Sequence, residues 1–185
     1  GMNIGGLSVG GFNNYKDKCL DVLMPGVQHL RHTLLPDHKF VKGQPDTGAE
    51  LAEDLELIAN KFEGEVAACI IEPIAGSTGV LVPPKGYLDK IKNICDKHGI
   101  LLIFDEVITG WGRTGSPFAS QEFNVTPDIM TLAKATTNGV VPMGVVAIRD
   151  GIYNTVIESA PEGAIELFHG YTYSGIPAAV AAALA

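Results

Sequence analysis

The sequence has little positive charge and few cysteines. Lysine and arginine together number 13 against 21 aspartates and glutamates, which gives a net charge of −8 at pH 7. Such a surface repels phosphate backbones, so we expect no nucleic-acid partner. Cys19, Cys69 and Cys95 are widely spaced and form no CxxC pair, so we expect neither a disulfide framework nor a metal site. A reducing cytoplasm suits this cysteine usage best.

A targeting signal is also lacking in the opening residues. Residues 1–4 carry no basic region and lead directly into a glycine-rich stretch, residues 5–11, which we expect to form a flexible turn. That stretch does not match GxGxxG and follows no predicted strand, so it does not indicate a dinucleotide site. We expect no leader and no membrane association.

The last residues lack the signals that end a helix. Residues 177–185 begin like a helix with Pro177 in the first turn, but they contain no C-cap and no polar face. We therefore expect this sequence to be a fragment whose end falls inside a helix.

What the sequence does contain is an alternation of apolar runs and amphipathic stretches, with 46% hydrophobic and 18% charged residues. This pattern is typical of an α/β fold in which helices cover a parallel sheet. Apolar spacing predicts helices over about residues 49–62 and around residues 88–95, the second ended by Gly99. Strands are predicted at residues 67–72, 100–105, 129–133 and 144–148.

Asp105 and Glu106 follow an apolar run, at the carboxyl end of a predicted strand. Open α/β sheets bind ligands at that edge, which favours a functional acid, although capping or solvent exposure is the plain alternative. The same pattern is typical of the magnesium-binding strand of P-loop ATPases. No Gly-Lys is followed by Ser or Thr in this sequence, so the ATPase remains a remote alternative.

Lys134 is the only charged residue between Asp128 and Arg149. The ordinary interpretation is a surface lysine whose aliphatic stem lies along apolar neighbours while its ammonium stays in water. Because its neighbours are apolar or small, however, we expect the ammonium to lie at a sheet end with little water around it. Loss of water lowers the pKa of a lysine and leaves more free amine, which attacks carbonyl groups.

An aspartate and a lysine at two strand ends suit pyridoxal 5′-phosphate. Parallel strands lie about 4.8 Å apart, which is close to the distance from the ring nitrogen of this cofactor to its aldehyde carbon. Asp105 would keep the ring nitrogen protonated, while Lys134 would hold the aldehyde.

These residues resemble the class III pyridoxal-phosphate-dependent aminotransferases, and within them the ω-amino acid–pyruvate (β-alanine–pyruvate) branch. The resemblance rests on LLIFDEV at 101–107, TGWGRTG at 109–115, PD at 127–128, AK at 133–134 and NG at 138–139. It extends to residues 70–88 and 168–177 and covers almost the whole chain. The implied fold is the α/β, three-layer large domain of the fold-type I transferases, incomplete at both ends.

The resemblance also implies roles for individual residues. Lys134 would form the Schiff base and move the substrate proton, and Asp105 would bind the pyridinium. Val107 would pack against one face of the ring, with plain core packing as the alternative. Glu72 would belong to a network on the substrate side, or would be an ordinary strand-end carboxylate. Thr172 would reach the cofactor phosphate of a neighbouring subunit, which implies a homodimer with shared active sites.

One residue departs from the family pattern, because Ile176 stands where relatives commonly carry histidine before the proline.

The expected activity is ping-pong transfer of an amino group from an ω-amino acid or amine to pyruvate. Another class III activity, such as a semialdehyde aminomutase or an ornithine-type aminotransferase, is the main alternative, and a non-catalytic remnant is a remote one. Residues 1–185 would form only part of the cofactor-binding large domain, without the N-terminal segment and the C-terminal small domain. We therefore expect this fragment by itself to be inactive.

Overall fold

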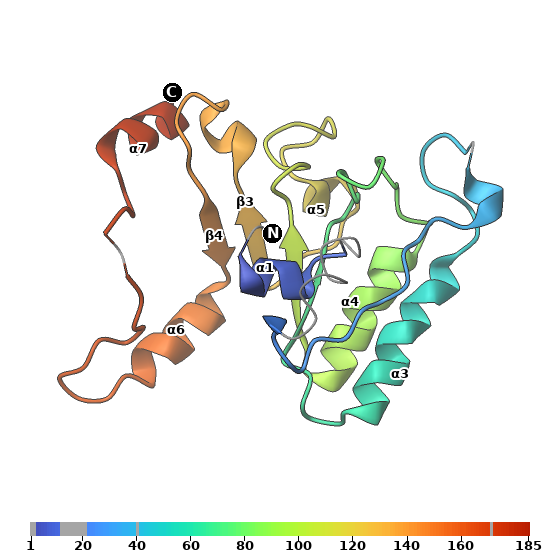
Figure 1. Cartoon of the computed structure of the whole chain (residues 1–185), viewed down its shortest axis with the longest axis horizontal. Coiled ribbons are helices and arrows are strands. Elements are labelled where there is room, and N and C mark those ends of the chain that lie inside the picture. The colour runs from blue at the N-terminus through green and yellow to red at the C-terminus, as the bar shows by residue number, and fades with distance from the viewer. Residues whose placement is uncertain (1–2, 12–21, 40, 171) are drawn as a thin grey trace.

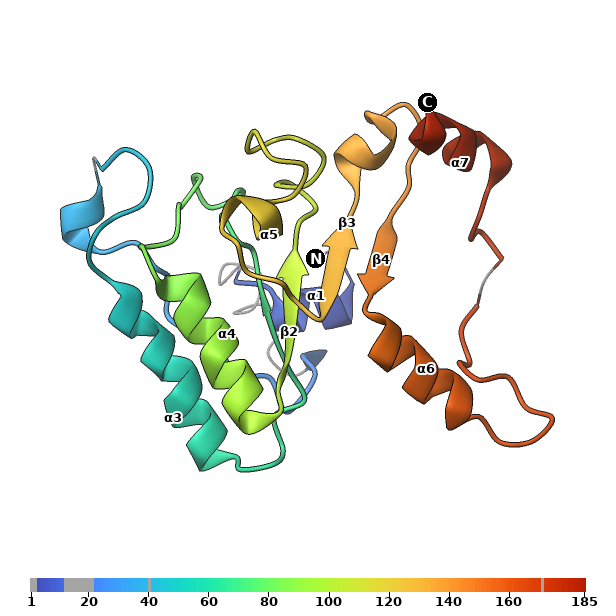
Figure 2. The same ribbon diagram turned by 180° about the vertical axis from the view of Figure 1, so that it is seen from behind.

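A mixed four-stranded sheet forms the centre of the computed structural model, which describes residues 3–11, 22–39, 41–170 and 172–185. The strands are β1 (Ala68–Ile71), β2 (Leu101–Asp105), β3 (Ile129–Leu132) and β4 (Val145–Ile148), and they lie in the order β1-β2-β3-β4. The first three are parallel. β4 runs antiparallel to β3, as the opposed arrows of these two strands show in Figure 2. All four predicted strands are present, within one or two residues of their expected ends.

The expectation of a wholly parallel sheet is wrong at β4. Only the 3-10 helix η4 (Lys134–Thr137) and turns connect β3 to β4. A parallel pairing usually needs an α-helix that crosses one face of the sheet, and this connection contains no α-helix, so the chain returns antiparallel.

The two predicted helices precede and connect the parallel strands. The 3-10 helix η3 (Ala49–Ala52) runs into α3 (Glu53–Lys61), and α4 (Tyr87–His98) joins β1 to β2. Gly99 ends α4 with φ +67°, a left-handed conformation that glycine adopts without the steric cost of a Cβ. Both predicted helices are confirmed, and β1, α4 and β2 form a βαβ unit.

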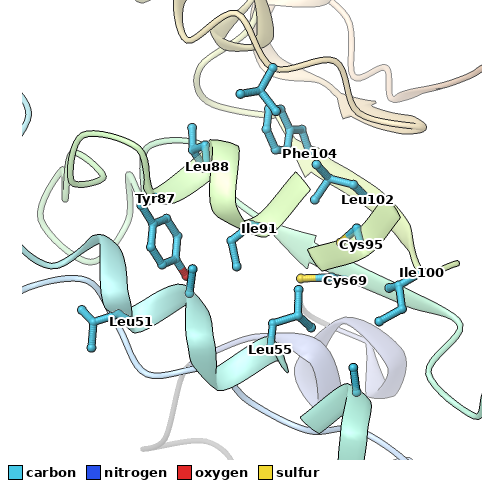
Figure 3. Close-up of a cluster of buried hydrophobic side chains, with 13 residues drawn as sticks. Leu51, Leu55, Cys69, Tyr87, Leu88, Ile91, Cys95, Ile100, Leu102 and Phe104 are labelled. Atoms are coloured by element: carbon cyan, nitrogen blue, oxygen red, sulfur yellow. The ribbon is translucent and has the colours of Figure 1, made fainter. Parts of the chain in front are cut away.

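The main hydrophobic core lies where α3 and α4 pack against one face of β1 and β2 (Figure 3). Because side chains alternate between the two faces of a strand, Leu102 and Phe104 point into this core while Ile103 and Asp105 point away. Each fully buried Leu, Ile or Phe contributes about 1.5–3 kcal/mol. The core consists of Leu51, Ala52, Leu55, Ala59, Cys69, Tyr87, Leu88, Ile91, Cys95, Ile100, Leu102, Phe104 and Val125.

Two cysteines belong to this core as free thiols. Cys69 and Cys95 are both buried. Contact with Cys95 and burial raise the pKa of the Cys69 thiol well above its ordinary value, so it is protonated at neutral pH. Cys19 lies outside the described residues.

Asp128 fastens the sheet at the start of β3. Its Oδ2 accepts a hydrogen bond from the Leu102 backbone N–H at 2.8 Å, and its Oδ1 lies 2.8 Å from Nη1 of Arg149, directly after β4. This buried carboxylate therefore holds β2, β3 and β4 in register.

The glycine-rich start is not the flexible turn that we expected. Residues Ile4–Val9 form the helix α1, because the Asn3 side chain accepts a hydrogen bond from Gly6 N at 2.7 Å and caps the first turn. The buried Ser8 hydroxyl accepts a hydrogen bond from Met24 N at 2.8 Å. α1 lies in front of the strands in Figure 1 and behind them in Figure 2, so it occupies the face opposite the short helix α5 (Ala119–Glu122).

The remaining helices are η2 (Pro36–His38), α6 (Asp150–Glu158) and α7 (Pro177–Leu184). The helix that the sequence predicted from Pro177 onward is confirmed as α7, which packs against η4. Among the described residues, no helix is long and apolar enough to cross a membrane.

Candidate active site

Three chemically active side chains lie at the carboxyl ends of adjacent parallel strands. Glu72 directly follows β1, Asp105 is the last residue of β2, and Lys134 lies two residues beyond β3. Ile71 pairs with Phe104 and Asp105 with Thr131, so Glu72 is level with Asp105 and Lys134 begins the turn beside them. The strand ends meet at one edge of the sheet (Figure 2), which is the edge where open α/β sheets bind ligands.

The Asp105 carboxylate is oriented by its own loop. Its Oδ1 accepts a hydrogen bond from the Val107 backbone N–H at 3.1 Å. Asp105 is half-buried and lies on the face of the sheet opposite α3 and α4, together with Thr131. Among the described residues, the other carboxylate oxygen, Oδ2, has no hydrogen-bond partner.

Val107, two residues after Asp105, does not continue the extended strand. β2 ends at Asp105, and residues 107–114 form consecutive turns. The two-residue period applies only to extended backbone. Val107 is half-buried, and its backbone N–H is the group that contacts Asp105.

Glu72 shapes the loop after β1. Its Oε2 accepts a hydrogen bond from the Gly76 N–H at 3.0 Å. Gly76 in turn packs closely against Ile108, since a Cβ at this position would lie 2.6 Å from the Ile108 Cδ1. The loops after β1 and β2 are therefore in direct contact beside Asp105.

Lys134 is exposed, which corrects our expectation that its ammonium would lie with little water around it. The apolar neighbours in sequence belong to β3 and to the turn that follows, and they do not enclose the side chain. Lys134 has φ +48°, a left-handed conformation that is uncommon for a residue with a Cβ. No ion pair involves its amine within the described part of the chain.

Glu106 was singled out in the sequence together with Asp105, with capping as one alternative, but its part in holding the loop after β2 was missed. It is fully buried, and its carboxylate accepts hydrogen bonds from the backbone N–H groups of Ala119 (2.6 Å) and Ser120 (2.8 Å) and from the Thr109 hydroxyl (3.2 Å). Glu106 thereby folds the 107–118 loop back onto α5. Strand alternation was an available signal, because it places Glu106 on the buried face, where a carboxylate needs several donors.

Trp111 and Thr136 were also missed. The indole Nε1 of Trp111 donates to the Thr136 hydroxyl at 2.9 Å, which joins the loop after β2 to the turn that carries Lys134. No spacing rule for a helix or a strand relates two residues that are 25 positions apart in different loops.

Thr172 is not brought to this edge of the sheet. It is exposed, and the segment between α6 and α7 that carries it runs beyond β4, away from β2 (Figure 1). Tyr171, within the same motif, lies outside the described residues.

Comparison with known proteins gives the chain a family. The family model described as "Aminotransferase class-III" matches residues 1–185. An omega-aminotransferase of Caulobacter vibrioides is 54% identical over 187 residues, which cover 100% of this chain and 42% of that protein. An omega-amino acid–pyruvate aminotransferase of Pseudomonas putida is 50% identical over 188 residues, with the same two coverages.

A solved structure agrees with the sequence relatives. The omega transaminase of Pseudomonas jessenii in complex with PMP superposes with a TM-score of 0.88 at 36% identity, covering 100% of this chain and 41% of that one. The chain belongs to the class-III aminotransferases. It spans about two fifths of the length of the relatives it matches.

Proposed function

We propose that this chain is part of a pyridoxal-phosphate enzyme that transfers an amino group from an ω-amino acid or amine to pyruvate. The observation that carries the proposal is the placement of Asp105 and Lys134 at the ends of the adjacent parallel strands β2 and β3. The full-length similarity of the chain to enzymes named for ω-amino acid–pyruvate and omega-amino transfer supports the choice of substrates.

The residues present fit the cofactor. Lys134 offers an exposed amine without an ion-pair partner among the described residues, which can bond to the cofactor aldehyde and can carry a proton to and from the substrate carbon. Asp105 offers a carboxylate held by Val107 N, which can accept a hydrogen bond from a protonated ring nitrogen. When bound, the cofactor supplies an electron sink for the substrate carbon.

Val107 and Glu72 have supporting roles in this proposal. Val107 lies beside Asp105 and would limit the movement of the ring on one face. Glu72, whose Oε2 is already held by Gly76 N, would contribute its other oxygen to the substrate side of the site. Both residues lie at the strand ends that converge on Asp105.

The proposed setting is the cofactor-binding large domain of a fold-type I enzyme, with three layers, working in the cytoplasm. The superposition of the whole chain on part of a solved transaminase supports the domain. The free thiols Cys69 and Cys95 are consistent with a reducing compartment.

The decisive experiment maps the covalent site in the full-length protein. The protein is incubated with pyridoxal phosphate, reduced with borohydride and digested, and the peptides are weighed. We expect the added mass on the Lys134 peptide, its loss in Lys134→Ala, and its retention in the control Lys90→Ala, which removes an exposed lysine on α4. An adduct on Lys85, Lys90 or Lys97 in place of Lys134 would overturn the assignment.

Asp105→Asn separates the two roles. The amide keeps the shape of the side chain, so the adduct on Lys134 should persist, whereas transamination of β-alanine and pyruvate should fall by about two to four orders of magnitude because the ring nitrogen loses its anionic partner. Asp96→Asn, an exposed acid on α4, is the matched control and should leave turnover unchanged. Profiling with ornithine and amino-aldehyde substrates distinguishes the main alternative activities.

We further propose a homodimer in which Thr172 reaches the partner subunit's cofactor phosphate. The exposure of Thr172 and of its apolar neighbours Phe168 and Tyr173 supports this, since they find no cover among the described residues. Mixing inactive Lys134→Ala with weakened Thr172→Val subunits should regenerate one intact site per mixed dimer, which is about a quarter of wild-type activity for random pairing. If mixing restores no activity, the sites are not shared.

A further inference from the structure

A chain of two hydrogen bonds connects the loop after β2 to the backbone of Lys134. Trp111 Nε1 donates to Thr136 Oγ1 at 2.9 Å, and the same hydroxyl donates to the Ala133 carbonyl at 3.1 Å. A hydroxyl has a single proton, so accepting from the indole leaves that proton directed at Ala133. Thr136 is only 7% exposed, which leaves little opportunity for water to replace either partner.

The backbone at Ala133 and Lys134, where these two hydrogen bonds end, is in an unusual conformation. Lys134 has φ +48°, and Ala133 before it is extended, with φ −161° and ψ −152°. A residue with a Cβ stays in the left-handed region only where its surroundings impose it. The Ala133 carbonyl accepts two hydrogen bonds, one from the Thr136 hydroxyl and one from the Thr136 backbone N–H at 3.0 Å. These bonds fix the backbone at the start of the turn that carries Lys134.

Trp111 is itself anchored independently of Thr136. Its ring lies edge-on to Phe118, with 5.2 Å between centroids and 64° between planes. Gly110 before it packs against Leu132, since a Cβ there would lie 2.9 Å from the Leu132 Cδ2. The indole N–H is therefore supplied from a loop that is fixed by its own contacts.

We propose that Trp111 and Thr136 are positioning residues that hold Lys134 in its left-handed conformation and so aim its amine at the aldehyde of the cofactor. The inference rests on the proposed function, because it assigns a purpose to the direction of the lysine. The φ angle of Lys134 sets the direction of its Cα–Cβ bond, and four further single bonds lead to the amine. A turn that fluctuates between conformations therefore presents the amine correctly for a smaller fraction of the time.

Three substitutions test these two hydrogen bonds in the full-length protein. Thr136→Val keeps the shape of the side chain and removes the hydroxyl, Trp111→Phe keeps an aromatic ring against Phe118 and removes the N–H, and Thr136→Ser retains the hydroxyl. The amine and aldehyde condense with loss of water, and borohydride reduces the C=N bond to a stable amine. The mass added to the Lys134 peptide, sampled over time, therefore measures the rate of bonding.

We expect Thr136→Val to slow the formation of the cofactor adduct on Lys134 about fivefold to tenfold, and Trp111→Phe to slow it about twofold to fivefold. The rate in Thr136→Ser should stay within about twofold of that of the natural protein. The double variant Trp111→Phe/Thr136→Val should be no slower than Thr136→Val, because both changes break one chain. Unchanged rates in both single variants, failure of serine to rescue, or multiplied effects in the double variant would each overturn the inference.

A second measurement needs no cofactor. The amides of Thr136 and Gly139 donate to the carbonyls of Ala133 and Lys134 at 3.0 and 3.1 Å. Their hydrogen exchange should be faster in Thr136→Val and Trp111→Phe than in Thr136→Ser, and equal exchange in all three would contradict the inference. If the natural protein forms no adduct on Lys134, the proposed function fails. The exchange data still decide whether the hydrogen bonds of Trp111 and Thr136 hold this turn.

Discussion

Helices α3 and α4 bury their apolar faces inside this chain, whereas none of the residues of α6 is buried in the described structure. Yet α6 also carries apolar side chains at helical spacing, Ile152 and Val156. After α6, residues 161–170 and 172–178 are all exposed. The two regions have similar amphipathic chemistry, and they differ because only the first has its complementary surface among the described residues.

The candidate site lies between these two regions. Asp105 ends a strand whose alternate side chains are fixed in the main core, so its backbone position is determined by extensive packing. Lys134 is exposed and begins a turn that is held by Thr136, Trp111 and α7. Asp105 is therefore placed by the core, while Lys134 is placed by a few polar contacts and by its packing against α7.

Truncation of an isoleucine in each region should give the largest contrast. Ile91 is fully buried on α4, and Ile157 on α6 is 39% exposed. We expect Ile91→Ala to lower the free energy of unfolding by about 2–5 kcal/mol, because it removes buried methyl groups and leaves a cavity. Ile157→Ala should cost about 0.5 kcal/mol or less. Urea unfolding of the 185-residue chain measures both.

A cost for Ile157→Ala as large as that for Ile91→Ala would break the comparison in the isolated chain. Measuring the free energy of unfolding of the same two variants in the full-length protein sharpens the comparison. If Ile157→Ala becomes costly only there, α6 is covered by residues outside this chain or by a partner subunit.

The sequence predicted the well-packed region better than the exposed one. The helices and strands from residue 49 to 105 follow from apolar periodicity and from Gly99, because local pattern and burial agree there. Asp105 and Lys134 could be selected because strand ends form the binding edge of such a sheet. Their places on adjacent strands follow from the order of the parallel strands.

Other features depend on contacts that no local pattern records. β4 runs antiparallel after a connection that contains only η4 and turns, and α1 depends on an Asn3 cap within a glycine-rich stretch. The exposure of Lys134 depends on what covers the sheet end, which flanking residues in sequence do not determine. The link from Trp111 to Thr136 requires the fold itself, because it joins two loops that approach only when β2 and β3 pair.

A pair of glycines should respond in opposite directions to the addition of a methyl group. At Gly110 a Cβ would lie 2.9 Å from both the Glu106 carbonyl oxygen and the Leu132 Cδ2, whereas at Gly151 on α6 it would meet nothing within 4 Å. We expect Gly110→Ala to destabilise by about 1–2 kcal/mol through overpacking. Gly151→Ala should be neutral or stabilise by up to about 1 kcal/mol, because alanine favours helix. Thermal unfolding would contradict this if both changes had the same sign.

The smallest expected effect is a pH-dependent contribution from the surface that joins α3 to α4. Glu56 Oε1 accepts a hydrogen bond from Lys97 Nζ at 2.6 Å and lies 3.0 Å from His98 Nε2, and these contacts lower the pKa of Glu56 from 4.5 to about 2. Because the folded-state pKa is the lower one, ionised Glu56 stabilises the fold above the unfolded value, and this contribution is lost as pH falls from about 4.5 to about 2. Glu56→Gln should therefore lower the melting temperature at pH 6, and its difference from the natural chain should shrink progressively toward pH 2. Glu53→Gln is the matched control on the same helix, because Glu53 approaches Lys90 only to 3.9 Å and its substitution should change the profile less. A Glu56→Gln difference that stays constant from pH 6 to pH 2 would show that the carboxylate contributes through packing and not through its charge.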